Sequence, residues 1–216
     1  MRSTAGAWAI AVVVFVLTAI PLRAVRGGTE RPGYLPEPTS IAFDSEWIGL
    51  SIEGDSLVVR GIFVFRCHGG GERSIPIFLP FPSDSLMGRG RMVSLSARSG
   101  AEPFAPARWE EVPTLPGARW WLPPCRGDSI VAEVMYRQKI EPGYASYIVR
   151  TIQSWGNPLR HAVFEIRLPE GATPIDFSFP FEPRAIDGET VYVYEVTDFF
   201  PDHDIVFRWI PAEARP

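Results

Sequence analysis

The chain has 216 residues, of which 46% are hydrophobic and 21% charged, and its formal net charge is −4 at pH 7. This length suits one large domain with short tails. Lys139 is the only lysine, and the arginines that supply the remaining positive charge are scattered. Because no basic stripe is present, we expect neither nucleic acid nor an anionic membrane surface as a partner.

The N-terminus has the order of parts of a secretory signal peptide. A single basic residue, Arg2, precedes an unbroken apolar run from Ala7 to Ile20, and small residues follow at Ala24 and Gly27. This pattern predicts cleavage near Ala24 or Gly27 and export to the periplasm or the medium. The alternative is that the apolar run stays in place as an N-terminal membrane anchor.

The segment boundaries follow from this interpretation. We predict a signal peptide over residues 1–27, a spacer rich in Pro and Gly over residues 28–40, and a single domain over residues 41–212. No second apolar segment of spanning length follows in the sequence. We therefore expect no membrane insertion once the signal peptide has been removed.

Export also changes the interpretation of the two cysteines. In an oxidising compartment a pair of thiols favours a disulfide over a metal or redox site, so we predict a bond between Cys67 and Cys125. It would close a loop of about 58 residues, worth about 4 kcal/mol in the chain-entropy model. Two free, buried cysteines are the alternative.

From Ile41 onward the sequence alternates between apolar and polar residues, and Gly, Pro, Asn and Asp separate the alternating stretches. The pattern contains no convincing helix. It predicts an all-β fold, an antiparallel two-sheet β-sandwich that is immunoglobulin-like or related, with about ten strands. A β-barrel is the alternative. The expected strands cover residues 41–52, 57–67, 74–82, 91–98, 118–122, 130–140, 162–168, 174–181, 190–197 and 205–209.

Three prolines indicate where one strand lies in its sheet. Pro76, Pro80 and Pro82 share one parity, so all three missing N–H donors lie on the same side of the strand. This is typical of an edge strand that is protected against further pairing.

A second segment, residues 146–169, indicates a change of direction. Within this segment the pattern on each side of Trp155 predicts a strand, and Gly156, Asn157 and Pro158 between the two strands suit a bend. We expect a hairpin corner in which Trp155 folds over the end of the sandwich and seals it.

The histidines and nearby carboxylates give weak site candidates. His68 lies in a Gly-rich turn, and His161 lies on the polar face of its strand. His203 stands between Asp202 and Asp204, which would point the same way on a strand and could present two oxygens to Ca²⁺. Two carboxylates are too few for a metal site, and a turn with local hydrogen bonds is the simpler interpretation. We therefore assign no metal, cofactor-binding or catalytic residues and expect no cofactor.

Tryptophans offer a further candidate. Trp109, Trp120 and Trp121 lie in a Pro-rich segment, and exposed aromatic side chains on a β-sandwich can stack against sugar rings. The alternative is that Trp120 and Trp121 face opposite ways, one into the core and one beneath a loop.

Several short stretches resemble those of a family of uncharacterised secreted bacterial β-rich domains. The matching pieces are Glu46–Ile52 (E-x-L-x-I type), Val59–Phe65 (V-x-Y-x-F type), Phe81–Pro82 (F-P-x-P type) and Tyr147–Leu159 (Y-x-L-x-T-x-x-x-W-x-x-P-L type). The resemblance covers most of residues 41–210 and implies an extracytoplasmic β-rich module without an assigned activity.

These observations favour an exported, non-catalytic β-sandwich with a binding or structural role at the cell envelope, where an envelope protein or a polysaccharide is the candidate partner. No G-x-S-x-G or H-E-x-x-H motif is present. A carbohydrate-binding module that uses exposed Trp is one alternative, and a hydrolase with an unrecognised carboxylate pair is another.

Overall fold

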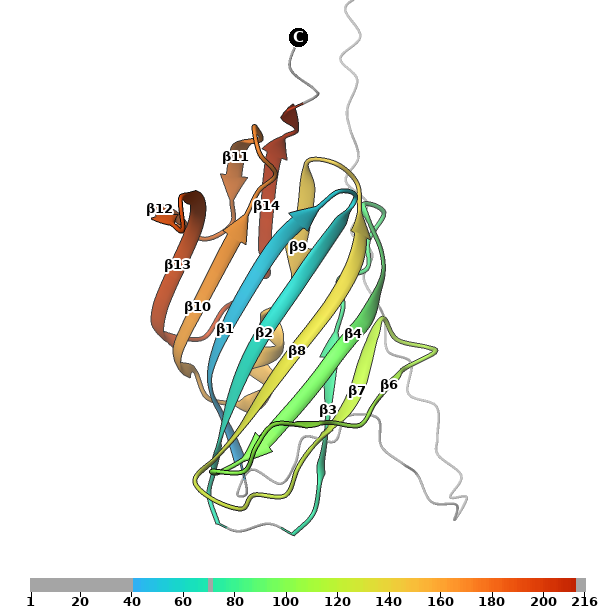
Figure 1. Ribbon diagram of the computed structural model, residues 1–216, viewed down its shortest axis with the longest axis vertical. Coiled ribbons are helices and arrows are strands. Elements are labelled where there is room, and N and C mark those ends of the chain that lie inside the picture. Colours follow the sequence, from blue (N-terminus) through green and yellow to red (C-terminus); the bar gives the residue numbers. More distant parts are fainter. Residues whose placement is uncertain (1–40, 70–71, 213–216) are drawn as a thin grey trace, which may run out of the picture. The chain divides into compact units, whose positions relative to one another are not determined.

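The computed structural model describes residues 41–69 and 72–212, and strands dominate this part of the chain (Figure 1). The predicted signal peptide and spacer lie outside the described residues. Within the described ranges, no helix is long and apolar enough to cross a membrane. The elements are β1 (Ile41–Glu53), β2 (Ser56–Cys67), β3 (Ile75–Pro80), β4 (Met87–Ser99), β5 (Ala105–Pro106), β6 (Trp109–Glu111), β7 (Gly117–Leu122), β8 (Ser129–Ile140), β9 (Tyr144–Tyr147), the 3-10 helix η1 (Arg150–Trp155), β10 (Leu159–Arg167), β11 (Thr173–Phe177), β12 (Glu182–Ile186), β13 (Glu189–Phe199) and β14 (Ile205–Ile210).

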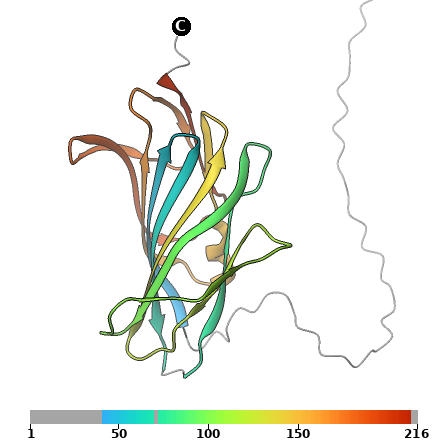
Figure 2. The same ribbon diagram turned by 45° about the vertical axis from the view of Figure 1, so that its right-hand side comes forward.

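The strands form one large sheet and two small ones. The large sheet has the order β12-β13-β10-β1-β2-β8-β4-β5, and the small sheets have the orders β11-β14-β9 and β3-β7-β6. All neighbouring strands are antiparallel except β1 and β10. Figures 1 and 2 show β3, β9 and η1 behind the large sheet. The predicted all-β sandwich is confirmed, and the barrel alternative is wrong because the large sheet is open, with β12 and β5 at its ends.

Alternation of apolar and polar residues along the central strands explains why one face of the large sheet is buried in the core. On β2, Leu57, Val59, Phe63 and Phe65 are buried on one face, while Arg60 and Arg66 are exposed on the other. A period of two residues places such a set on a single face of the sheet. The small sheets cover this face with bulky side chains, among them the fully buried Trp120 of β7 and Phe207 of β14.

Strand β3 lies at the edge of its small sheet, beside β7. Just beyond the strand, the Phe81 N–H donates to the Pro116 carbonyl at 2.9 Å, so the odd-numbered N–H groups of this segment face β7. The even positions, including Pro76 and Pro80, therefore face the open edge, where proline removes a donor that no neighbouring strand requires. Pro82 lies past the end of the strand, and its carbonyl accepts a hydrogen bond from the Gln138 amide.

The structure corrects the hairpin predicted over residues 146–169. β9 ends at Tyr147, and Arg150–Trp155 forms η1 instead of continuing as a strand. The N–H groups of Val149 and Arg150 donate to Asp204 Oδ1 at 3.1 Å each, and this distant acceptor starts the helical turn. β9 and β10 belong to different sheets, so the segment crosses from one layer to the other. Local sequence does not reveal an acceptor that lies more than fifty residues away along the chain.

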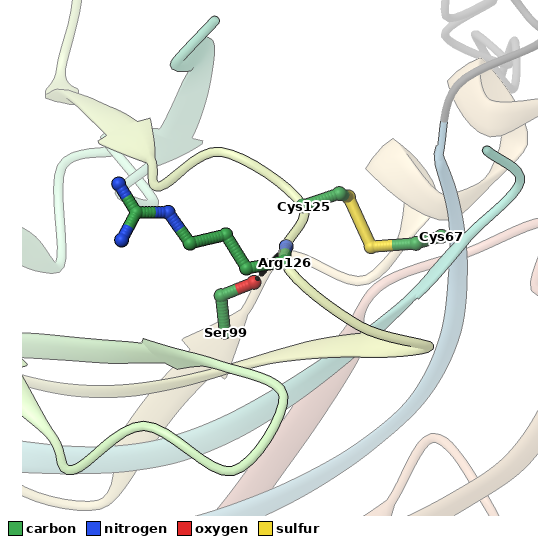
Figure 3. The surroundings of a disulfide bond; sticks show 4 residues. All are labelled: Cys67, Ser99, Cys125 and Arg126. Atoms are coloured by element: carbon green, nitrogen blue, oxygen red, sulfur yellow. Dashed lines mark hydrogen bonds between the residues drawn. A yellow bond between two sulfur atoms is a disulfide. The ribbon is translucent and has the colours of Figure 1, made fainter. Parts of the chain in front are cut away.

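A disulfide joins Cys67, at the end of β2, to Cys125, in the connection between β7 and β8 (Figure 3). The S–S distance is 2.12 Å, and the two Cα atoms lie 6.1 Å apart. Hydrogen bonds reinforce the same connection, because the Arg126 N–H donates to Ser99 Oγ at 2.7 Å and the Cys67 N–H donates to the Asp128 carbonyl at 2.9 Å. The loop before β8 is therefore anchored to both β2 and β4.

Candidate functional site: a cavity with a buried carboxyl

A cavity of about 370 Å³ lies over the inner face of β1 and β2. The edge strand β3 forms one wall, and η1 with the residues before it forms the other. This volume falls within the range of small-molecule sites, which are typically concave and mostly apolar with a few polar groups. The lining residues are Phe43, Glu46, Phe63, Phe65, Pro76, Ile77, Phe78, Leu79, Pro80, Trp120, Tyr147, Ile148, Val149, Thr151, Ile152, Ser154 and Trp155.

An irregularity in β1 shapes the floor of the cavity. The register of β1 against β2 shifts between Phe43 and Ser45, and such a bulge reverses the parity of the side chains on either side of it. Phe43 and Glu46 therefore both line the cavity, although one number is odd and the other even. Phe43 pairs with Phe65, and their rings stack with centroids 5.0 Å apart, while Glu46 pairs with Phe63.

Glu46 is the polar feature of this floor. Its side chain is buried, with 6% relative exposure, and its Oε1 atom has no hydrogen-bond partner among the described residues. Burial raises the pKa of the Glu46 carboxyl to about 8, because desolvation disfavours the charged form. The Glu46 carboxyl is thus mostly uncharged at pH 7.

Tyr147, at the end of β9, is the titratable neighbour of this carboxyl. Burial raises the pKa of the Tyr147 phenol, and the charges of Glu46 and Tyr136 raise it further. Tyr136 of β8 is itself buried, and its hydroxyl has no partner within the described part of the chain. Both phenols stay neutral over the physiological range, so Glu46 is the group of this cluster that titrates near neutral pH.

The walls are largely aromatic and aliphatic. Trp155 contacts the floor, with its ring centroid 5.7 Å from that of Phe43 and 5.6 Å from that of Phe65. We expected this tryptophan to seal the end of the sandwich, and the structure places it in the lining of the cavity. On the opposite side Phe78 of β3 is 38% exposed and forms part of an apolar rim.

The three histidines lie outside the cavity lining. His68 is exposed just after β2, and His161 Nε2 lies 3.1 Å from Glu195 Oε1 on the exposed face of the large sheet. His203 stacks on Phe179 with ring centroids 4.3 Å apart. The Ser178 carbonyl, 3.0 Å from His203 Nε2, and then the Asp202 carboxylate raise the pKa of His203.

Asp202 and Asp204 have separate partners. Asp204 accepts from the backbone at the start of η1, and its Oδ2 also lies 3.0 Å from Arg150 Nε. Asp202 is exposed and contacts His203 Nδ1 at 2.5 Å. The role of Asp204 is thus to position η1, which is one wall of the cavity.

The tryptophans of the Pro-rich segment do not form an exposed platform in the described structure. Trp120 is buried in the core, and Trp109 lies opposite it in the register of β6 and β7. Trp121 is half-buried and faces the other way, with the Arg108 guanidinium 4.4 Å above its ring.

Sequence reasoning missed Glu46 as a site residue, although a signal was present. Glu46 has the parity of Ile48, Leu50 and Ile52, which form the buried face of β1. A carboxyl on an apolar strand face is a departure from the pattern, and perturbed buried acids are frequent at functional sites. What the sequence did not reveal is the open space beside the carboxyl.

Comparison with solved structures finds proteins that resemble this chain at low sequence identity. A Legionella pneumophila protein to which nutrient binding has been attributed matches with a TM-score of 0.55 at 14% identity, over 81% of this chain and 69% of its own. An M1 zinc metallopeptidase from Deinococcus radiodurans matches with a TM-score of 0.47 at 12% identity, over 78% of this chain and 42% of its own. The chain thus spans less than half of that peptidase.

No protein-family model and no curated protein sequence matches the chain. At such low identity the Legionella pneumophila likeness shows the fold alone. The resemblance to uncharacterised secreted β-rich domains stays a prediction.

Proposed function

We propose that this protein is an exported, non-catalytic binding module whose ligand is a small, largely apolar molecule held in the cavity between β3 and η1. The observation that carries the proposal is the Glu46 carboxyl, which is buried in the lining of an apolar cavity of about 370 Å³ and has an oxygen with no hydrogen-bond partner among the described residues. A buried polar group without a hydrogen bond costs stability, and a ligand that supplies the missing bond recovers that cost.

Three further features support the proposal. The disulfide fits an oxidising, extracytoplasmic compartment. The nutrient binding attributed to the Legionella pneumophila protein of similar fold is compatible with a ligand cavity. Among the described residues that line the cavity, Glu46 is the only one with a carboxyl group, whereas glycoside hydrolysis requires a pair of carboxyl groups.

The test uses a neutral hydrophobic fluorophore, N-phenyl-1-naphthylamine, titrated into the purified protein. Thr151 lines the cavity from η1 and is exposed, so Thr151→Trp should fill the space with little effect on folding. Asn157→Trp, just beyond η1 and outside the lining, is the matched control.

We expect saturable, one-to-one binding to the unmodified protein and to Asn157→Trp, and a loss of at least tenfold in affinity for Thr151→Trp. Equal binding by both variants, or no saturable binding by the unmodified protein, would rule the cavity out as the site.

A further inference from the structure

The ionisable side chains that line the cavity in the described structure are acids, and none of them is a base. Glu46 lines it, but no lysine, arginine or histidine among the described residues lines it to compensate a carboxylate. The titratable neighbour from β9 is Tyr147, with Tyr136 of β8 beyond it, while β2 and β10 place Phe63 and Ala162 beside Glu46. A charge on Glu46 therefore has no partner in the described protein.

Building on the proposed function, we infer that the ligand is a small organic cation, an alkyl- or arylammonium ion, whose charge pairs with Glu46 and whose apolar part lies among the aromatic side chains. Buried carboxylates are stable when they are paired with a cation and hydrogen-bonded. Here the ligand would supply the cation that the described lining lacks.

The aromatic lining suits a cation. Phe43, Phe63, Phe65, Trp120, Tyr147 and Trp155 all border the cavity. Aromatic faces carry a negative electrostatic potential and attract an ammonium group, more strongly where water is excluded. The same faces disfavour an anion, which would also meet the carboxyl of Glu46.

The backbone of β3 adds acceptors. At the open edge of this strand Pro76 and Pro80 each present a carbonyl group but no N–H. Phe78 presents one carbonyl group and one N–H. These three carbonyls face away from β7, and no described residue hydrogen-bonds to them. An edge rich in acceptors and poor in donors complements a primary ammonium, which has three N–H donors and no acceptor.

Pairing with a cation requires Glu46 to lose its proton, because its carboxyl is mostly protonated below pH 8 when no cation is bound. Binding of an ammonium ion should therefore release about one proton per ligand at pH 6–7. The observed affinity should rise about tenfold from pH 6 to pH 7, and level off above pH 8. Above the pKa of the amine itself the affinity should fall again.

Isothermal titration calorimetry tests the cation assignment with three probes that share a phenylethyl group. The probes are 2-phenylethylamine as the cation, 2-phenylethanol as the neutral analogue and 3-phenylpropanoate as the anion. Each is titrated at pH 6, 7 and 8 into the unmodified protein and Glu46→Gln, in buffers of different ionisation enthalpy so that proton release is measured directly. The anion is included because Trp120 Nε1, from the cavity lining, is a buried donor with no partner in the described part of the chain.

We expect the amine to bind at least tenfold more tightly than the alcohol at pH 8, with the pH dependence described above. Glu46→Gln should lower the affinity for the amine at pH 8 by at least tenfold and abolish the proton release, and it should change the affinity for the alcohol by a smaller factor. Thermal unfolding of Glu46→Gln at pH 8 checks that the variant is folded.

Preference for the alcohol or for the anion, or amine binding without proton release, would overturn the cation assignment. Failure of all three probes while N-phenyl-1-naphthylamine still binds at the cavity would also overturn it, and would leave the proposed binding function standing. If N-phenyl-1-naphthylamine also failed to bind, both the cation assignment and the proposed binding function would be contradicted.

Discussion

Replacing Glu46 with glutamine should change how the stability of the protein depends on pH. In the folded protein burial raises the pKa of this carboxyl from 4.5 to about 8. Below pH 4.5 the carboxyl is protonated in both the folded and the unfolded chain, so the ionisation of Glu46 does not change the free energy of unfolding. Between these pKa values the unfolded chain loses the proton and the folded chain keeps it, and the folded state becomes less stable as pH rises.

The magnitude follows from the two pKa values. Each pKa unit corresponds to 1.36 kcal/mol, so ionisation of Glu46 should cost the folded state on the order of 3 kcal/mol at pH 7. Above pH 8 the cost should level off on the order of 5 kcal/mol. Glu46→Gln removes the ionisation and keeps the shape, so its stability relative to the unmodified protein should increase with pH by these amounts.

Urea denaturation at pH 4, 6, 7 and 8.5 measures the effect. Groups that titrate in both proteins cancel in the difference between their free energies of unfolding, which leaves the contribution of Glu46. Glu170→Gln, at an exposed turn, is the matched control and should show a constant difference near zero. If the difference for Glu46→Gln were also constant across this pH range, the buried, protonated state of Glu46 would be refuted.

The remaining predictions concern the disulfide and the wall of the cavity. The double variant Cys67→Ser, Cys125→Ser should lose about 4 kcal/mol of unfolding free energy in urea, because the unfolded chain regains the freedom of the closed loop; an unchanged midpoint would contradict this. Trp155→Ala should lower stability by about 2 kcal/mol, since a half-buried ring is lost, and should weaken binding of N-phenyl-1-naphthylamine because Trp155 lines the cavity; unchanged probe affinity would show that the ring does not reach the ligand. Asp204→Ala should cost about 1–2 kcal/mol through loss of the bonds to the start of η1, whereas Asp202→Ala should have little effect; equal losses for the two would contradict the assigned role of Asp204.

Where strands alternate cleanly, sequence predicted the fold well. The pattern of β2 and β8 places one apolar face inward, and the structure shows the same faces buried. The short strands β5 and β6 were missed, because two or three residues are too few to establish a period. η1 was mistaken for part of a strand because the residues before Trp155 suited a two-sided strand, yet the acceptor that starts the helical turn is Asp204 from another part of the chain.

The sequence by itself determined the class of fold, since period-two hydrophobicity with Gly and Pro between the runs is compatible only with a β-rich domain. It also held the signal for Glu46 that was missed, because Glu46 has the parity of Ile48 and Leu50 and alternate residues of a strand point the same way. Only the tertiary structure decided that the bulge in β1 brings Phe43 to the side of Glu46, and that β3 and η1 leave a cavity above them. The reason is physical: parity along a strand is a local property, whereas empty space beside a side chain depends on how separate layers meet.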